Sequence, residues 1–176
     1  MRWLLTCALV ALAATPGRAE VVDAAAGGFT ARVAETIQAP PEVVYRRLVA
    51  ISGWWGSDHT FSGDARNLTL DVRPGGCWCE ALPDGGGVRH MEVVNAVPGR
   101  SLVLHGALGP LQAMAVAGAL SITLTASPAG TVVEARYAVA GYAPSGLAAL
   151  AAPVDSVLTA QFARLKAVAE SGAPTR

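Results

Sequence analysis

Charge is scarce in this sequence. Charged residues make up 15% of the 176 positions, and 13 basic residues balance 13 acidic ones. Lysine is nearly absent, with Lys166 alone against twelve arginines, and no basic patch is visible. Proteins that bind nucleic acids or anionic membrane surfaces use such patches to neutralise phosphates. We therefore expect no nucleic-acid partner.

The sequence also lacks the motifs of several common chemistries. It has no Gly-x-Ser-x-Gly nucleophile elbow and no phosphate-cradling or dinucleotide-binding glycine motif. Its three histidines, His59, His90 and His105, lie on separate segments and show no paired spacing with one another or with the cysteines. Structural zinc sites usually have ligands in closely spaced pairs along the sequence, so we expect no metal and no cofactor. His90 is expected on the solvent face of a strand.

Long apolar runs are missing outside the first nineteen residues. Arg2 precedes an apolar run over residues 3–14, after which Pro16 and Gly17 break the pattern. This run is shorter than the roughly 20 residues that a spanning helix needs. The layout is that of a secretory signal peptide cleaved after Ala19. It predicts a periplasmic or secreted protein with one domain over residues 20–176 and no membrane span.

Cysteine is rare as well. Cleavage would leave only Cys77 and Cys79, and export would permit a disulfide between them. In an extended strand, residues i and i+2 have Cα atoms about 6.5–7 Å apart, at the outer limit for such a bond. A kink at residues 75–76 would allow it. The alternative is two small side chains on one face of a sheet, and the sequence leaves both open.

Alternation and turn residues predict the order of the elements. Residues 29–37 alternate between apolar and polar, as in a half-buried strand. Residues 39–42 (APPE) then open a helix that reaches Ile51. Turn residues separate the segments after this helix, which is typical of an antiparallel meander. The expected strands cover residues 68–72, 77–82, 88–97, 101–105, 118–126 and 131–140. A loose lid is expected over residues 107–117, before the strand at 118–126.

The C-terminal region changes period. Apolar residues recur every 3.6 positions over residues 154–169, which predicts a long amphipathic helix. A curved antiparallel sheet with one apolar face needs such a helix laid across it. The sequence therefore predicts an α+β domain of about seven strands wrapped around a C-terminal helix, with a pocket beneath the helix.

This order of elements resembles the START-like (SRPBCC) superfamily, which has a helix-grip fold. The resemblance rests on the run IQAPPEVV at residues 37–44 leading into Trp-Trp-Gly at 54–56, and on GGCWCE at 75–80 followed by residues 93–104. It covers residues 29–170 and is greatest for the polyketide cyclase and Hsp90-ATPase-activator-homologous branch. Most members bind hydrophobic ligands in a cavity and a few are enzymes with differing catalytic residues. The resemblance therefore implies a fold and a cavity but no catalytic residue.

Five residues are candidates for lining that cavity. Trp54 is expected in the core and Trp55 at the cavity entrance. Methionine suits adaptable apolar pockets, and a buried tyrosine hydroxyl needs a polar partner. The candidate ligand-binding residues are Trp55, Met91, Met114, Tyr137 and, more weakly, Tyr142.

Glu35 is the one candidate catalytic residue. It falls in phase with the apolar positions Val33 and Ile37 of the first strand. A carboxylate inside an apolar cavity has a raised pKa and can act as an acid or base. The alternatives are that a bulge or the strand end turns it to water, or that an arginine pairs with it.

Three functions are compatible with these patterns. The first is a binding protein that holds a hydrophobic or amphipathic small molecule. The second is a cyclase- or isomerase-type enzyme that uses Glu35 or Tyr137 as an acid–base group. The third is a protein-interaction module in which the apolar stretch over residues 107–117 docks on a partner protein. It predicts a filled core with no cavity and an exposed apolar patch.

Overall fold

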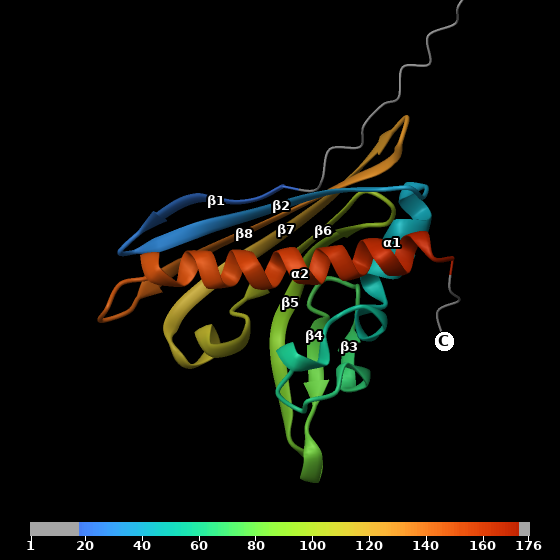
Figure 1. Ribbon diagram of the computed structural model, residues 1–176. Helices are drawn as coiled ribbons and strands as arrows, with labels where there is room; N and C mark the ends of the chain where they lie inside the picture. The colour runs from blue at the N-terminus through green and yellow to red at the C-terminus, as the bar shows by residue number, and fades with distance from the viewer. Residues whose placement is uncertain (1–17, 173–176) are drawn as a thin grey trace, which may run out of the picture.

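A single antiparallel sheet with one long helix across it makes up the structure, a computed structural model that describes residues 18–172. The predicted signal peptide, apart from its last two residues, lies outside the described residues. The sheet has eight strands in the order β1-β2-β8-β7-β6-β5-β4-β3, and α2 crosses one face while α1 lies near the C-terminal end of α2 (Figure 1). The strands are β1 (Arg18–Ala25), β2 (Gly28–Ile37), β3 (Leu68–Leu70), β4 (Cys77–Ala81), β5 (Gly87–Val97), β6 (Ser101–Gly106), β7 (Ala115–Ser127) and β8 (Gly130–Tyr142), and the helices are α1 (Pro41–Val49) and α2 (Ala151–Glu170).

The sheet confirms the α+β class and the C-terminal helix, but it has eight strands and not seven. The additional strand is β1, which pairs antiparallel with β2 and places Glu20 opposite Arg32. The pairing shifts register between Val21 and Asp23. This irregularity interrupts the two-residue period by which a strand is recognised in a sequence.

The core lies between α2 and the inward face of the sheet. Helix α2 packs mainly on β2 and contributes Leu158, Phe162 and Leu165, each at most 1% exposed. Complete burial of such a side chain stabilises the fold by about 1.5–3 kcal/mol. Pro41 starts α1 because proline suits a first helical turn, and α1 adds Leu48 to the same core.

A β-bulge joins β4 to β5. Trp78 pairs with Met91, whereas Cys79 pairs with Arg89, so His90 is an extra residue in β5. The prediction that His90 faces solvent is wrong, because the extra residue places the side chains of His90 and Met91 both inside, at 5% and 1% exposure. A bulge shifts the alternation by one position without leaving a local signature in the sequence.

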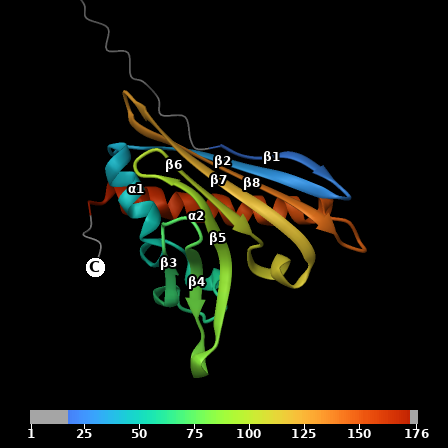
Figure 2. The ribbon, with the colours of Figure 1, turned by 180° about the vertical axis from the view of Figure 1, so that it is seen from behind.

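The other face of the sheet is not covered by either helix (Figure 2). Small residues on β7 and β8, among them Ala117, Ala119, Ala138 and Ala140, form the floor of an open groove of about 610 Å³. Neither helix in the described part of the chain is both long and apolar enough to cross a membrane.

Candidate functional site

Three tryptophans and a phenylalanine form an aromatic cluster between α2 and the sheet. Trp54 and Trp55 follow a short 3-10 helix (Ile51–Gly53), Trp78 lies on β4 and Phe162 lies midway along α2. The ring centroids are 5.6 Å apart for Trp54 and Trp55, and 4.7 Å apart for Trp55 and Trp78, both edge to face. The Phe162 ring lies 5.8 Å from Trp54. Such contacts are favourable beyond the area that they bury.

The void that this aromatic cluster borders is small. Its volume is about 10 Å³, roughly the space of one water molecule. The remaining wall is aliphatic and consists of Leu48, Ile51, Leu70, Leu102, Leu104, Leu120 and Ile122. The indole rings thus fill the space in which the sequence predicted a pocket, and a larger molecule requires part of the wall to move.

The three indole N–H groups differ in their hydrogen bonds. Trp54 Nε1 donates to the carbonyl of Leu48 at 3.0 Å, and Trp55 Nε1 donates to the carbonyl of His59 at 2.9 Å. Trp78 Nε1 is buried and has no acceptor within residues 18–172. Leaving a buried donor unpaired costs about 1–3 kcal/mol. An acceptor that came within hydrogen-bond distance of this nitrogen would remove the cost.

Residues 55–67, here called the cover segment, close one side of the aromatic cluster. The cover segment contains two 3-10 helices, Ser57–His59 and Ala65–Asn67, and no strand. It carries Trp55 into the cluster. Because the Trp55 indole is bonded to His59 within the same segment, we expect ring and segment to move as one unit.

Two buried polar side chains hold the cover segment in place. Gln161 on α2 is 1% exposed, and its Oε1 accepts the Gly56 backbone N–H at 2.7 Å. Glu80 on β4 accepts the backbone N–H groups of Phe61, at 3.1 Å, and of Ser62. The cover segment is therefore attached by hydrogen bonds to α2 at one end and to β4 further along.

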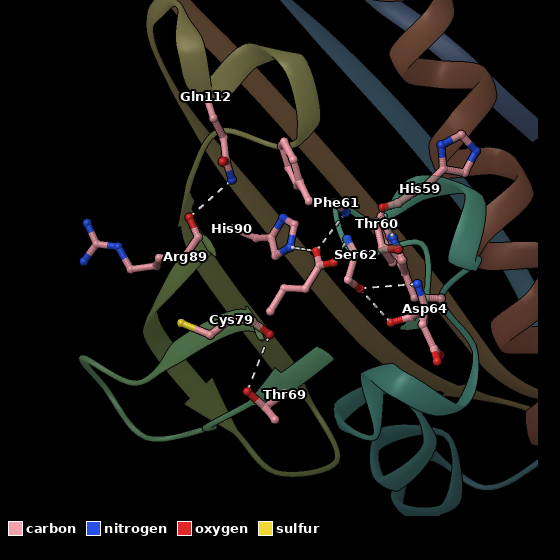
Figure 3. Close-up of polar contacts among 12 residues, drawn as sticks. His59, Thr60, Phe61, Ser62, Asp64, Thr69, Cys79, Arg89, His90 and Gln112 are labelled. Carbon is pink, nitrogen blue, oxygen red and sulfur yellow. Dashed lines mark hydrogen bonds and ion pairs between the residues drawn. The ribbon is translucent and has the colours of Figure 1, made fainter. Parts of the chain in front are cut away.

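Glu80 is also paired with His90. The His90 Nε2 lies 2.8 Å from Glu80 Oε2, and the two side chains are 5% and 0% exposed. Figure 3 draws this contact as a dashed line from the His90 ring. The imidazole packs between the rings of Phe61 and Trp78, with centroids 5.8 Å and 5.6 Å away. The bulge in β5 thus connects the aromatic cluster to a buried acid–histidine pair.

The protonation of Glu80 is set by its neighbours. Burial acts to raise the pKa of Glu80, but hydrogen bonds from Ser62, Phe61 and His90 together outweigh it and hold the pKa below its ordinary value of 4.5. Glu80 is therefore ionised at neutral pH. A carboxylate that orients a histidine is the arrangement found in acid–base pairs, and here the same carboxylate also anchors the cover segment.

Glu35 lies away from the aromatic cluster. It faces α2, as the alternation predicted, and is 8% exposed. Its Oε2 lies 3.3 Å from Lys166 Nζ on that helix. The partner is thus a lysine rather than an arginine, and the pair links β2 to α2.

Tyr137 is completely buried, and its hydroxyl is occupied by the backbone. It accepts the Leu108 N–H at 3.0 Å and donates to the Gly106 carbonyl at 3.5 Å. Burial raises the pKa of Tyr137 to about 12. The hydroxyl therefore stabilises the segment that connects β6 to β7.

Of the five predicted ligand-binding residues, only Trp55 lines the void. Met91 is 1% exposed within the sheet, Met114 is partly buried before β7, and Tyr142 is 70% exposed at the end of β8. The lid predicted over residues 107–117 is a short 3-10 helix followed by the start of β7. Trp54 lies in the core, as predicted.

Cys77 and Cys79 are bonded to each other, which resolves the two alternatives left open by the sequence. Their Cα atoms are 5.4 Å apart. The register shift of the β4–β5 pairing falls between Trp78 and Cys79, opposite the extra residue His90 of β5, and not at residues 75–76.

Sequence reasoning missed four residues of the site. Trp78 and Glu80 are two positions apart on a strand that was predicted, so their shared inward face was open to inference. Gln161 stands one position before Phe162 on the predicted helix, but its polarity pointed to solvent. His90 was concealed by the bulge.

Comparison with solved structures finds this fold in other bacterial proteins. An uncharacterized protein from Rhizobium leguminosarum has a TM-score of 0.61 at 21% identity, over 89% of this chain and 99% of the other. A Mesorhizobium loti protein has a TM-score of 0.58 at 20% identity, over 82% and 99% of the two chains. One from Chromobacterium violaceum has 0.57 at 18%, over 80% and 96%. No family model matches the chain, and no curated protein matches its sequence. At these identities the likeness shows the fold alone.

Proposed function

We propose that this chain is an exported START-like protein with a helix-grip fold, which binds a small apolar or amphipathic molecule in the aromatic cluster beneath α2. The resemblance of the sequence to that superfamily and the antiparallel sheet laid around α2 support the assignment. The leader at residues 1–19 supports export to the periplasm or the medium.

The unpaired N–H of Trp78 is the observation that carries this proposal. Trp78 lines an otherwise apolar void next to Trp55, and its buried indole N–H has no acceptor within residues 18–172. Small-molecule sites combine apolar walls with a few polar groups that fix orientation. A ligand with one carbonyl or hydroxyl oxygen would satisfy the donor while its apolar part packs against the indoles.

Displacement of the cover segment provides the route by which a ligand enters the aromatic cluster. It contains no strand, and opening it breaks the hydrogen bonds to Gln161 and Glu80 rather than a sheet ladder. Displacement of the cover segment withdraws Trp55 from the cluster, which frees a space of about one indole ring. The bound ligand replaces the buried contacts of Trp55.

A matched pair of ligands tests the donor. Acetophenone and α-methylstyrene have nearly the same shape, but only the first has an acceptor. We expect acetophenone to bind about three- to tenfold more tightly, which is the net value of one hydrogen bond. Tryptophan fluorescence is a specific readout, because residues 20–176 contain no tryptophan other than Trp54, Trp55 and Trp78.

Two variants complete this test. Trp78→Phe removes the unpaired N–H and should abolish the preference for acetophenone. Trp54→Phe removes an N–H that already has an acceptor in Leu48, and should preserve it. Equal affinity of the unmodified protein for both molecules would count against Trp78 as the polar contact.

A cyclase- or isomerase-type enzyme is the second candidate, and the Glu80–His90 pair is the observation that favours it. Glu80 is ionised and holds His90 at 2.8 Å, directly beside Trp78. Glu35 and Tyr137, in contrast, have their polar atoms bonded to Lys166 and to the backbone. A His90→Gln variant that binds the same molecules but no longer exchanges their α-protons with solvent would support the enzyme.

A further inference from the structure

The Cys77–Cys79 disulfide takes no part in the aromatic cluster, although the residue between the cysteines does. Trp78 points inward from β4, so alternation places both cysteines on the face turned away from α2. Neither cysteine is fully buried. The bond therefore lies within reach of molecules in solution.

This disulfide is poorly suited to a stabilising role. It closes a loop between residues only two positions apart. The constraint that a disulfide places on the unfolded chain grows with the length of the closed loop, so it is near its minimum here. Accessible disulfides are also reduced more readily than buried structural ones. Both properties fit a bond that is made and broken.

The two sulfurs have different charged neighbours. In the β4–β5 pairing, Arg89 lies opposite Cys79 and Glu92 lies opposite Cys77. Arg89 and Glu92 are exposed and form an ion pair at 3.1 Å. Figure 3 shows the Arg89 side chain and the Cys79 sulfur on the same side of the strands. A cation favours a thiolate and an anion disfavours one, so Cys79 is the better leaving group.

We propose that Cys77 and Cys79 form a thiol–disulfide exchange site whose substrates are thiols. An incoming thiolate attacks Sγ of Cys77, the Cys77–Cys79 bond breaks, and Cys79 leaves as a thiolate beside Arg89. A second external thiolate then attacks the external sulfur of the mixed disulfide, the bond to Cys77 breaks, and Cys77 leaves as a thiolate while the external disulfide is released. Two external thiols are oxidised to one disulfide, and the protein takes up two electrons and two protons as a dithiol. The reverse sequence restores the bond.

Redox titration of the mature chain, residues 20–176, tests this site. The protein is equilibrated in glutathione buffers of graded ratio, and its free thiols are counted by alkylation and mass spectrometry. An exchange site is half-reduced within the series, whereas a structural disulfide stays oxidised throughout. A parallel arm uses reduced ribonuclease A. Oxidation of ribonuclease as well as glutathione identifies protein thiols as substrates, and oxidation of glutathione alone identifies small thiols.

The role of Arg89 has its own matched control. Arg89→Gln should slow reduction by glutathione by a few-fold, because the leaving Cys79 thiolate loses its neighbouring cation. Arg66→Gln removes another exposed arginine from a carboxylate pair elsewhere on the surface and should leave the rate unchanged. A disulfide that remains oxidised in every buffer and with both thiols overturns the proposal, and it does so whether or not the aromatic cluster binds a ligand.

Discussion

Glu80 is the residue on which the site depends most. Its carboxylate is fully buried and accepts hydrogen bonds from two backbone N–H groups of the cover segment and from His90. His90 is buried beside it, so without the carboxylate its ring nitrogen would lose its partner in a site away from water. One side chain therefore fixes both the position of the cover segment and the orientation of the histidine.

Replacing Glu80 with glutamine should destabilise the protein by about 3 kcal/mol. The amide replaces one acceptor oxygen with an NH2 donor, although all three partners of Glu80 are donors. It also removes the buried charge that pairs with His90. The measurement is denaturant unfolding at neutral pH. Glu92→Gln is the control, since it removes a carboxylate from an exposed ion pair and should cost less than about 1 kcal/mol.

The effect of Glu80→Gln should also depend on pH. The pKa of Glu80 is lower in the folded protein than its ordinary value of 4.5, so the unfolded chain binds this proton first as the pH falls. The stability that Glu80 contributes is complete above pH 4.5 and decreases through the interval below it. The two unfolding curves should therefore converge in acid, and a difference that is constant down to the folded pKa would contradict the assignment.

At the scale of the elements, the sequence predicted most of the architecture. Alternation located β2 and β4 to β8 to within a few residues, because turn residues separate them and each has one buried face. It missed β1, whose register shifts within the strand, and it misplaced His90, because a bulge adds one residue and exchanges the faces of the residues before it. The acid–histidine pair depends on that bulge. The fold of the molecule could therefore be predicted from the sequence, but the pair could not.

The packing between β6, β7 and β8 allows a sharp test at this scale. A Cβ at Gly118 would lie 2.5 Å from Tyr137 Cε2 and 2.8 Å from the Gly106 carbonyl oxygen. Gly118→Ala should therefore cost about 2–3 kcal/mol by overpacking. Gly53→Ala is the matched control, since no atom lies within 4 Å of a Cβ there, and its unfolding midpoint should hardly change. Equal midpoints for the two variants would show that the Tyr137 ring can move away without cost.

For the molecule as a whole, α2 and the sheet enclose a core that is nearly filled in this structure. A void of about 10 Å³ satisfies what the interaction-module hypothesis requires of the core, and the uncovered face of the sheet carries an apolar groove. Ligand binding remains our proposal because Trp78, which lines that void, carries a buried donor with no acceptor within residues 18–172. In addition, the neighbouring cover segment is held by few hydrogen bonds. The two hypotheses differ in whether the core ever opens.

Native mass spectrometry of residues 20–176, exported and purified without detergent, tests this most directly. We predict a non-covalent adduct of small-molecule mass, either on the protein as purified or after acetophenone is added. Trp78→Phe should reduce the fraction of protein that carries acetophenone, and Trp54→Phe should leave this fraction unchanged. A spectrum that shows only the mass of the polypeptide, both as purified and with acetophenone present, would contradict the proposal that the aromatic cluster binds a ligand.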